Sequence, residues 1–172
     1  MRHQVMLVVG LSAMLAVSPA GTLAARQRTS GKQDRVATSH GVETQRVEGG
    51  VLQVDVTGKG AVFCSWGLLQ AVRHVGRECH KGKDVAFQAE VQRSLNRIET
   101  FIMANSRVPV KRADLARRRI EGLKQLQSSG NLCAGDAEKL YDAMRVGGAA
   151  ALQAQTTELL SIPREPAMNP CL

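Results

Sequence analysis

Apolar residues recur every three or four positions through most of the chain after residue 60, which is the spacing of one face of an α-helix. The clearest example is a stripe of five apolar side chains: Phe87, Val91, Leu95, Ile98 and Ile102. Asp84 precedes this stripe, and aspartate is a residue type favoured at helix N-caps. The spacing therefore predicts a helix over residues 84–106 that begins at Asp84.

Two shorter stripes predict one helix before this one and one after it. The first helix is expected over residues 64–78, with the stripe Trp66, Leu69, Val72 and Val75. The third is expected over residues 112–128, with the stripe Ala116, Ile120, Leu123 and either Leu126 or Gln127.

A fourth helix is expected from Asp136, as its N-cap, to about Leu159. Its stripe consists of six residues: Ala137, Leu140, Met144, Ala151, Gln155 and Leu159. Gly147-Gly148 interrupts the pattern, and a glycine inside a helix costs about 1 kcal/mol relative to alanine. The glycine pair therefore predicts a kink, a break or a close helix crossing.

The segments on either side of the helices lack helical periodicity. Residues 26–50 are polar and rich in Gln, Ser, Thr and Gly, which predicts a flexible leader. Residues 52–56 alternate between apolar and polar, which is typical of a strand. Because one strand alone cannot form a sheet, we expect an extended arm, and a strand that awaits a partner chain is the alternative. The tail contains Pro163, Pro166 and Pro170, so it is expected to be extended.

The N-terminus carries the three parts of a secretory signal peptide. Arg2 provides a positive start, an apolar run covers residues 5–17, and small residues follow Pro19. The apolar run is shorter than the roughly 20 residues that span a bilayer, although an uncleaved anchor remains the alternative. We therefore expect a cleavable signal over residues 1–25 and a protein that is exported, either periplasmic or secreted, and not integral to a membrane.

Four cysteines follow the predicted signal, and in an exported chain they predict two disulfides: Cys64, Cys79, Cys133 and Cys171. Cys64 and Cys79 bracket the first helix, so roughly 22 Å separates them, and a disulfide requires Cα atoms within about 7 Å. In an up-down bundle, Cys79 and Cys133 meet at one end and the tail brings Cys171 to Cys64 at the other. The predicted pairs are Cys79–Cys133 and Cys64–Cys171.

These patterns predict an all-α fold, because the few aromatic residues also favour closely packed helices over a β-sandwich. The expected architecture is a small four-helix bundle with antiparallel up-down connectivity and two disulfides. A flexible N-terminal leader precedes it and an extended Pro-rich tail follows it. The expected boundaries are 1–25 for the signal peptide, 26–60 for the leader with its short strand, and 61–172 for the helical disulfide-bonded domain.

Catalytic and metal-binding motifs are weak in this sequence. His74, Cys79 and His80 lie close together, but adjacent Cys79 and His80 cannot readily bind one metal ion, so neither a metal site nor a cofactor is expected. Ser65 and His74 lack the Gly-x-Ser-x-Gly context of a hydrolase nucleophile. Four carboxylates remain as candidates for an acid–base pair: Glu78, Asp84, Glu90 and Glu99.

Net charge provides the main functional indication. The formal charge is +8, or +7 once Arg2 leaves with the signal. Four cations near the start of the third helix form a candidate binding surface: Arg107, Lys111, Arg112 and Arg118. A basic exported protein encounters acidic proteins and anionic envelope polymers, and without interleaved aromatics this surface does not favour nucleic acid.

We therefore expect a non-catalytic interaction module that recognises an acidic protein or an anionic envelope polymer through its basic surface. Two alternatives stay open at this point. One is a small envelope hydrolase, or an accessory to one, with a site between helices. The other is a ligand carrier, in which the small residues of the fourth helix flank an apolar cavity.

Overall fold

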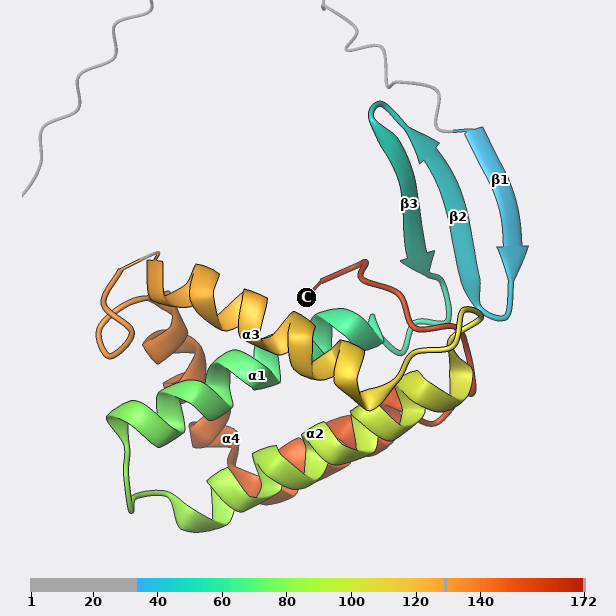
Figure 1. The fold of residues 1–172 in the computed structure, drawn as a ribbon. Helices are drawn as coiled ribbons and strands as arrows, with labels where there is room; N and C mark the ends of the chain where they lie inside the picture. The colour runs from blue at the N-terminus through green and yellow to red at the C-terminus, as the bar shows by residue number, and fades with distance from the viewer. Residues whose placement is uncertain (1–33, 129, 172) are drawn as a thin grey trace, which may run out of the picture. The chain divides into compact units, whose positions relative to one another are not determined.

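The computed structural model describes residues 34–128 and 130–171, in which a three-stranded sheet precedes four helices (Figure 1). The predicted signal peptide over residues 1–25 lies outside the described residues. None of the helices in the described part of the chain is both long and apolar enough to cross a membrane.

The four predicted helices are confirmed. They are α1 (Val62–Cys79), α2 (Val85–Asn105), α3 (Arg112–Ser128) and α4 (Asp136–Leu159). Helix α1 packs against the other three helices, and α2 also packs against α4. The predicted interruption of α4 is present as well, because Gly148 adopts φ 77° and ψ 177° inside it.

The apolar stripes predicted for α1 and α2 form the core of the domain. All four stripe residues of α1 and all five of α2 are buried. Tyr141, Leu152 and Leu159 of α4 complete this core, together with Leu115 of α3. Burial of these side chains is the main favourable contribution to folding, at roughly 25 cal/mol per Å² of apolar surface.

The predicted stripes of α3 and α4 are wrong in part. Leu115 is the buried residue of α3, whereas Ile120 of the predicted stripe is 52% exposed. The buried positions of α4 are Tyr141, Leu152, Thr156 and Leu159. Leu159 is buried as predicted, whereas the other three each follow a predicted position by one residue. Helix α3 contacts the core only near its first turn, so the apolar spacing along the rest of it does not mark a buried face. In α4, the break at Gly148 divides the apolar pattern into two parts.

The N-terminal region corrects the expected all-α fold. Residues that we expected in a flexible leader form a sheet of β1 (Asp34–Ser39), β2 (Val42–Val47) and β3 (Gly50–Asp55). The strands run antiparallel in the order β1-β2-β3, with Val42 opposite Asp55 and Val47 opposite Gly50. The predicted short strand is thus β3, and it pairs within its own chain instead of forming an arm.

Two tight turns explain why hydrophobic periodicity missed this sheet. His40 and Gly41 both have positive φ and join β1 to β2, which is the conformation that two-residue hairpins favour. Gly49, with φ 89°, lies in the turn between β2 and β3. Backbone pairing and turn geometry hold these strands in register, while most of the side chains of β2 and β3 are polar or exposed.

Both disulfides join the pairs that helix geometry predicted. The Cα atoms are 5.3 Å apart in Cys64–Cys171 and 5.6 Å apart in Cys79–Cys133. The first bridge links the beginning of α1 to the end of the tail, and the second links the end of α1 to the segment before α4.

The tail returns along β3 and the first turn of α1. The amide of Asp55 donates to the Asn169 carbonyl at 2.7 Å, and the amide of Phe63 donates to the Ala167 carbonyl at 2.9 Å. The tail therefore adds backbone hydrogen bonds to both elements and holds the sheet beside the helices.

Arg164 is the central polar residue of this junction. Its side chain is fully buried and forms an ion pair with the equally buried carboxylate of Asp55. The same guanidinium donates to the carbonyl oxygens of Gly60, Leu159 and Ile162 at 2.7–3.0 Å. One side chain thus joins the end of β3, the approach to α1, the end of α4 and the tail.

Two initial expectations about caps also change. Asp84 is at the N-cap of α2, but it has φ 48° and its side chain forms no capping hydrogen bond. Gly135, not Asp136, is the N-cap of α4.

Replacing Arg164 should show how much the junction matters. We expect Arg164→Met to lower the free energy of unfolding by about 3–5 kcal/mol, because Asp55 would keep a buried carboxylate without its counter-charge. Urea denaturation followed by far-UV circular dichroism measures the change. The matched control is Lys139→Met, which removes an exposed pair with Asp136 and should cost less than about 1 kcal/mol. A loss no larger than that of the control would contradict the prediction.

Candidate functional site

A groove of about 390 Å³ lies between α1 and α3 and combines an apolar floor with arginines. We call it the basic groove. Its lining residues from α1 are Trp66, Gly67, Gln70 and Ala71, and those from α3 are Arg118, Arg119, Gly122, Leu123, Gln125 and Leu126.

Two glycines leave the groove open. A Cβ atom built on Gly67 of α1 or on Gly122 of α3 would meet no heavy atom within 4 Å. Larger side chains at these two positions would therefore point into empty space. The groove also exists because α3 packs on the core through Leu115 in its first turn, and the rest of the helix is partly or fully exposed.

The floor of the groove is held by a buried carboxylate on α2. Trp66 Nε1 donates to Glu99 Oε1 at 3.3 Å, and Gln70 Nε2 donates to the same oxygen at 3.4 Å. Arg112 Nη1, at the start of α3, lies 3.9 Å from Glu99 Oε2. Glu99 thus fixes the two α1 side chains that line the groove and attracts the first turn of α3.

Two arginines of α3, Arg118 and Arg119, bring positive charge to the groove lining. Arg73 lies on α1 outside this lining, and its guanidinium donates to Gln92 Oε1 at 3.1 Å. Burial lowers the pKa of Arg73, and the positive charges of Arg119 and Arg77 lower it further, while Glu99 acts in the opposite direction. A guanidinium remains charged near neutral pH despite such a shift, so the groove lining attracts anionic ligands.

An unpartnered acceptor also lines the groove. Gln70 is only 5% exposed, and its Oε1 atom has no hydrogen-bond partner among the described residues, although its Nε2 is engaged by Glu99. A buried carbonyl without a donor costs roughly 1–3 kcal/mol. Because this oxygen is itself buried, it is an unsatisfied acceptor of the interior beneath the groove.

The structure distributes the four predicted cations differently. Arg118 lines the basic groove, with its guanidinium 5.9 Å from the centre of the Phe63 ring. Arg112 lies near Glu99, and Arg107 forms an ion pair with Glu165 at 3.2 Å. Lys111 precedes α3, and its backbone amide donates to Asp114. Of the four predicted residues, only Arg118 therefore lines the groove.

Arg119 lines the groove but is not among the four predicted cations. The signal for it was the run Arg117-Arg118-Arg119. Arg117 pairs with Asp114, while Arg118 and Arg119 line the groove.

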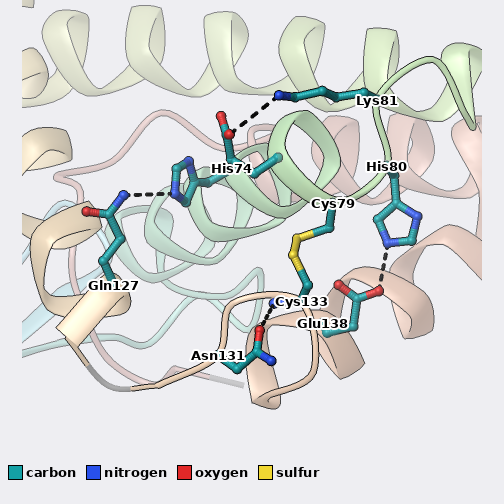
Figure 2. Close-up of a disulfide and its surroundings, with 9 residues drawn as sticks. His74, Cys79, His80, Lys81, Gln127, Asn131, Cys133 and Glu138 are labelled. Carbon is teal, nitrogen blue, oxygen red and sulfur yellow. Dashed lines mark hydrogen bonds and ion pairs between the residues drawn. A yellow bond between two sulfur atoms is a disulfide. The ribbon is translucent and has the colours of Figure 1, made fainter.

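The histidines and cysteines considered as metal ligands have other partners. Figure 2 shows Cys79 bonded to Cys133, His80 facing Glu138, and His74 facing Gln127. His80 Nε2 lies 2.7 Å from Glu138 Oε1, and His74 Nε2 lies 3.5 Å from Gln127 Nε2. In residues 34–128 and 130–171, no group of three or more His, Cys, Asp or Glu side chains is placed to hold a metal ion.

The residues considered for a hydrolase are likewise engaged separately. Ser65 Oγ donates to the Ala61 carbonyl, and the four candidate carboxylates have different partners. Glu78 lies near Lys81, Asp84 accepts from Tyr141, Glu90 pairs with Arg93, and Glu99 accepts from Trp66 and Gln70.

Tyr141 organises a second polar cluster, at the opposite end of α1 from the tail. Its ring stacks on His80 with centroids 4.4 Å apart, and its hydroxyl donates to Asp84 Oδ2 at 3.1 Å. Gly76 makes room for it, since a Cβ there would lie 3.1 Å from the Tyr141 ring. Burial raises the pKa of Tyr141 to about 12, and the hydrogen bond to Asp84 and its negative charge add to this effect.

The chain matches no protein-family model, and comparisons with curated proteins and with solved structures give no match.

The pKa of Tyr141 is directly measurable because it is the only tyrosine in the chain. We expect phenolate absorbance to rise with a midpoint near pH 12 in the folded protein, and near pH 10 in concentrated urea. Folding favours the neutral form of the Tyr141 side chain. The contribution of this group to the free energy of unfolding is therefore complete below about pH 10 and is lost as the pH rises toward 12.

Asp84→Asn provides the control for this titration. Without the aspartate charge, the folded midpoint should move toward that of the unfolded chain. Equal midpoints with and without urea would contradict the assignment.

Proposed function

We propose that this chain is an exported, non-catalytic binding module whose basic groove takes an acidic segment of a partner protein. The observation that carries the proposal is the position of Arg118 and Arg119 beside the apolar lining of the groove. A ligand carboxylate there would be attracted by both guanidinium groups.

The floor favours a peptide over a purely anionic polymer. Trp66, Leu123 and Leu126 line it, and such a surface is suited to an apolar side chain of the partner. A carboxylate and an apolar anchor occur together in an acidic peptide.

The groove is suited to binding rather than chemistry. Its lining residues include no Ser, Cys, His, Asp or Glu, so it contributes neither a nucleophile nor a carboxylate pair. The other predicted cations, Arg107, Lys111 and Arg112, would form the outer part of the same basic surface at the start of α3.

The proposal includes export and the antiparallel up-down arrangement expected from the sequence. Two disulfides support an oxidising compartment, either the periplasm or the exterior. The predicted signal peptide is the sequence feature behind this part of the proposal.

A synthetic peptide rich in Glu and Leu, labelled with a fluorophore, tests this function by anisotropy. We expect its affinity for the full oxidised chain to fall as salt rises from low to physiological concentration, because exposed charges are then screened. Gly122→Leu should weaken binding about tenfold, since the leucine fills the groove and buries apolar surface that the ligand would otherwise cover.

Matched arginine variants separate this groove from general basicity. Arg119→Gln should weaken peptide binding, whereas Arg117→Gln removes the same charge from a residue outside the groove lining and should have little effect. Equal effects of these two variants, or binding unchanged by salt, would contradict the proposal. Polyglutamate that binds as well as the peptide, and is unaffected by Gly122→Leu, would instead indicate an anionic polymer.

A further inference from the structure

A second groove, separate from the basic groove, runs between α1 and α4. We call it the apolar groove; its volume is about 680 Å³. Its apolar lining consists of Leu68, Leu69, Ile98, Met144, Leu152 and Leu159. Ligand sites in proteins are typically clefts of about 300–1,000 Å³ with mostly apolar walls and a few polar groups.

The break in α4 separates the residues that form this groove. Met144 lies before Gly148, while Leu152 and Leu159 lie after it, and Figure 1 shows that α4 changes direction between them. The sequence alone suggested that residues 147–151 would flank an apolar cavity. Instead, the lining comes from residues on either side of that glycine- and alanine-rich run.

Polar side chains within the groove are satisfied inside the protein. Thr156 Oγ1 donates to Ser94 Oγ at 2.9 Å, and Ser65 Oγ donates to the Ala61 carbonyl at 3.1 Å. These hydroxyls therefore do not require a polar partner from a ligand. The groove interior suits a hydrocarbon chain.

One end of the groove carries a cation. Lys59 lines it and forms an ion pair with Glu158, which lines it too. The Lys59 side chain is 29% exposed, whereas that of Glu158 is 65% exposed. Lys59 is thus held against the protein, while Glu158 can return to water at little cost if another carboxylate takes its place.

We propose that the apolar groove binds a single-chain fatty acid, with its hydrocarbon chain along α4 and its carboxylate on Lys59. On binding, the ligand carboxylate replaces Glu158 as the partner of Lys59, and the exposed Glu158 carboxylate turns to water with its charge solvated. The two grooves use different residues of α1: Leu68 and Leu69 line the apolar groove, and Trp66 and Gln70 line the basic groove. The two linings therefore share no residue.

Isothermal titration of the full oxidised chain with dodecanoate, decanoate and dodecanol tests this site. Dodecanoate should bind more tightly than decanoate, by about fourfold for each additional buried methylene. Lys59→Met, which retains an apolar stem, should weaken dodecanoate about two- to fivefold and leave dodecanol unchanged. Glu158→Gln should strengthen dodecanoate, because it removes the competing carboxylate.

Ala154→Trp tests whether the hydrocarbon chain of the ligand lies along α4. Ala154 lines the groove and is exposed, so a larger side chain there fills the groove without disturbing the core. It should weaken dodecanoate and dodecanol at least tenfold while leaving acidic-peptide binding unchanged. Gly122→Leu should do the opposite, so that failure of this site and failure of the basic groove are distinguishable.

Three outcomes would overturn the proposal. The first is that neither dodecanoate nor dodecanol binds, or that both bind Ala154→Trp as well as they bind the unchanged protein. The second is that Lys59→Met weakens binding of dodecanoate and dodecanol equally. The third is a dimer, seen by sedimentation, that Ala154→Trp dissociates, because a second copy of the chain would then occupy the groove.

Discussion

The ion pair between Arg164 and Asp55 is the constraint on which the rest of the structure depends. Neither side chain is exposed, so neither charge can be moved without leaving the other unpaired in the interior. The guanidinium also donates to carbonyl groups from two stretches of chain, Gly60 before α1 and residues 159–162 at the end of α4, and the native arrangement brings these acceptors together. Such a pair contributes less to net stability than to the choice of one arrangement over others; we offer this as a hypothesis for this chain.

The tail follows from that arrangement. Once Arg164 is fixed, Ala167 and Asn169 are held beside Phe63 and Asp55, and Cys171 reaches Cys64. Strands β2 and β3 bury few apolar side chains, so hydrophobic burial gives them little reason to associate with the helices. Backbone hydrogen bonds and a covalent bridge provide that association here. The sheet therefore belongs to the folded domain because of residues that lie more than a hundred positions away from it in sequence.

Sequence reasoning succeeded where burial was periodic and failed where other forces decide. Helix α2 was predicted closely because Phe87 to Ile102 all face one core. The sheet was missed because β2, with the sequence VETQRV, has no apolar alternation. Its turns and its backbone pairing define the sheet instead. Tyr141 was not recognised as a core residue, since its position depends on space left by Gly76 and on a hydrogen bond to Asp84. In the basic groove, Arg118 belongs to the predicted cations, but Trp66 and Gln70 come from another helix, α1, and no local pattern reveals which helices become adjacent.

The Cys79–Cys133 bridge has a consequence for the wall of the basic groove. It closes a ring of chain that contains both α2 and α3, although only the first of these helices contributes a full stripe to the core. Helix α3 is thereby attached in two ways: Leu115 anchors its first turn in the core, and the bridge ties the segment after it to the end of α1. Reduction of this bridge would remove the second attachment and leave the first. The part of α3 that lines the basic groove therefore depends on a covalent bond that oxidising compartments preserve.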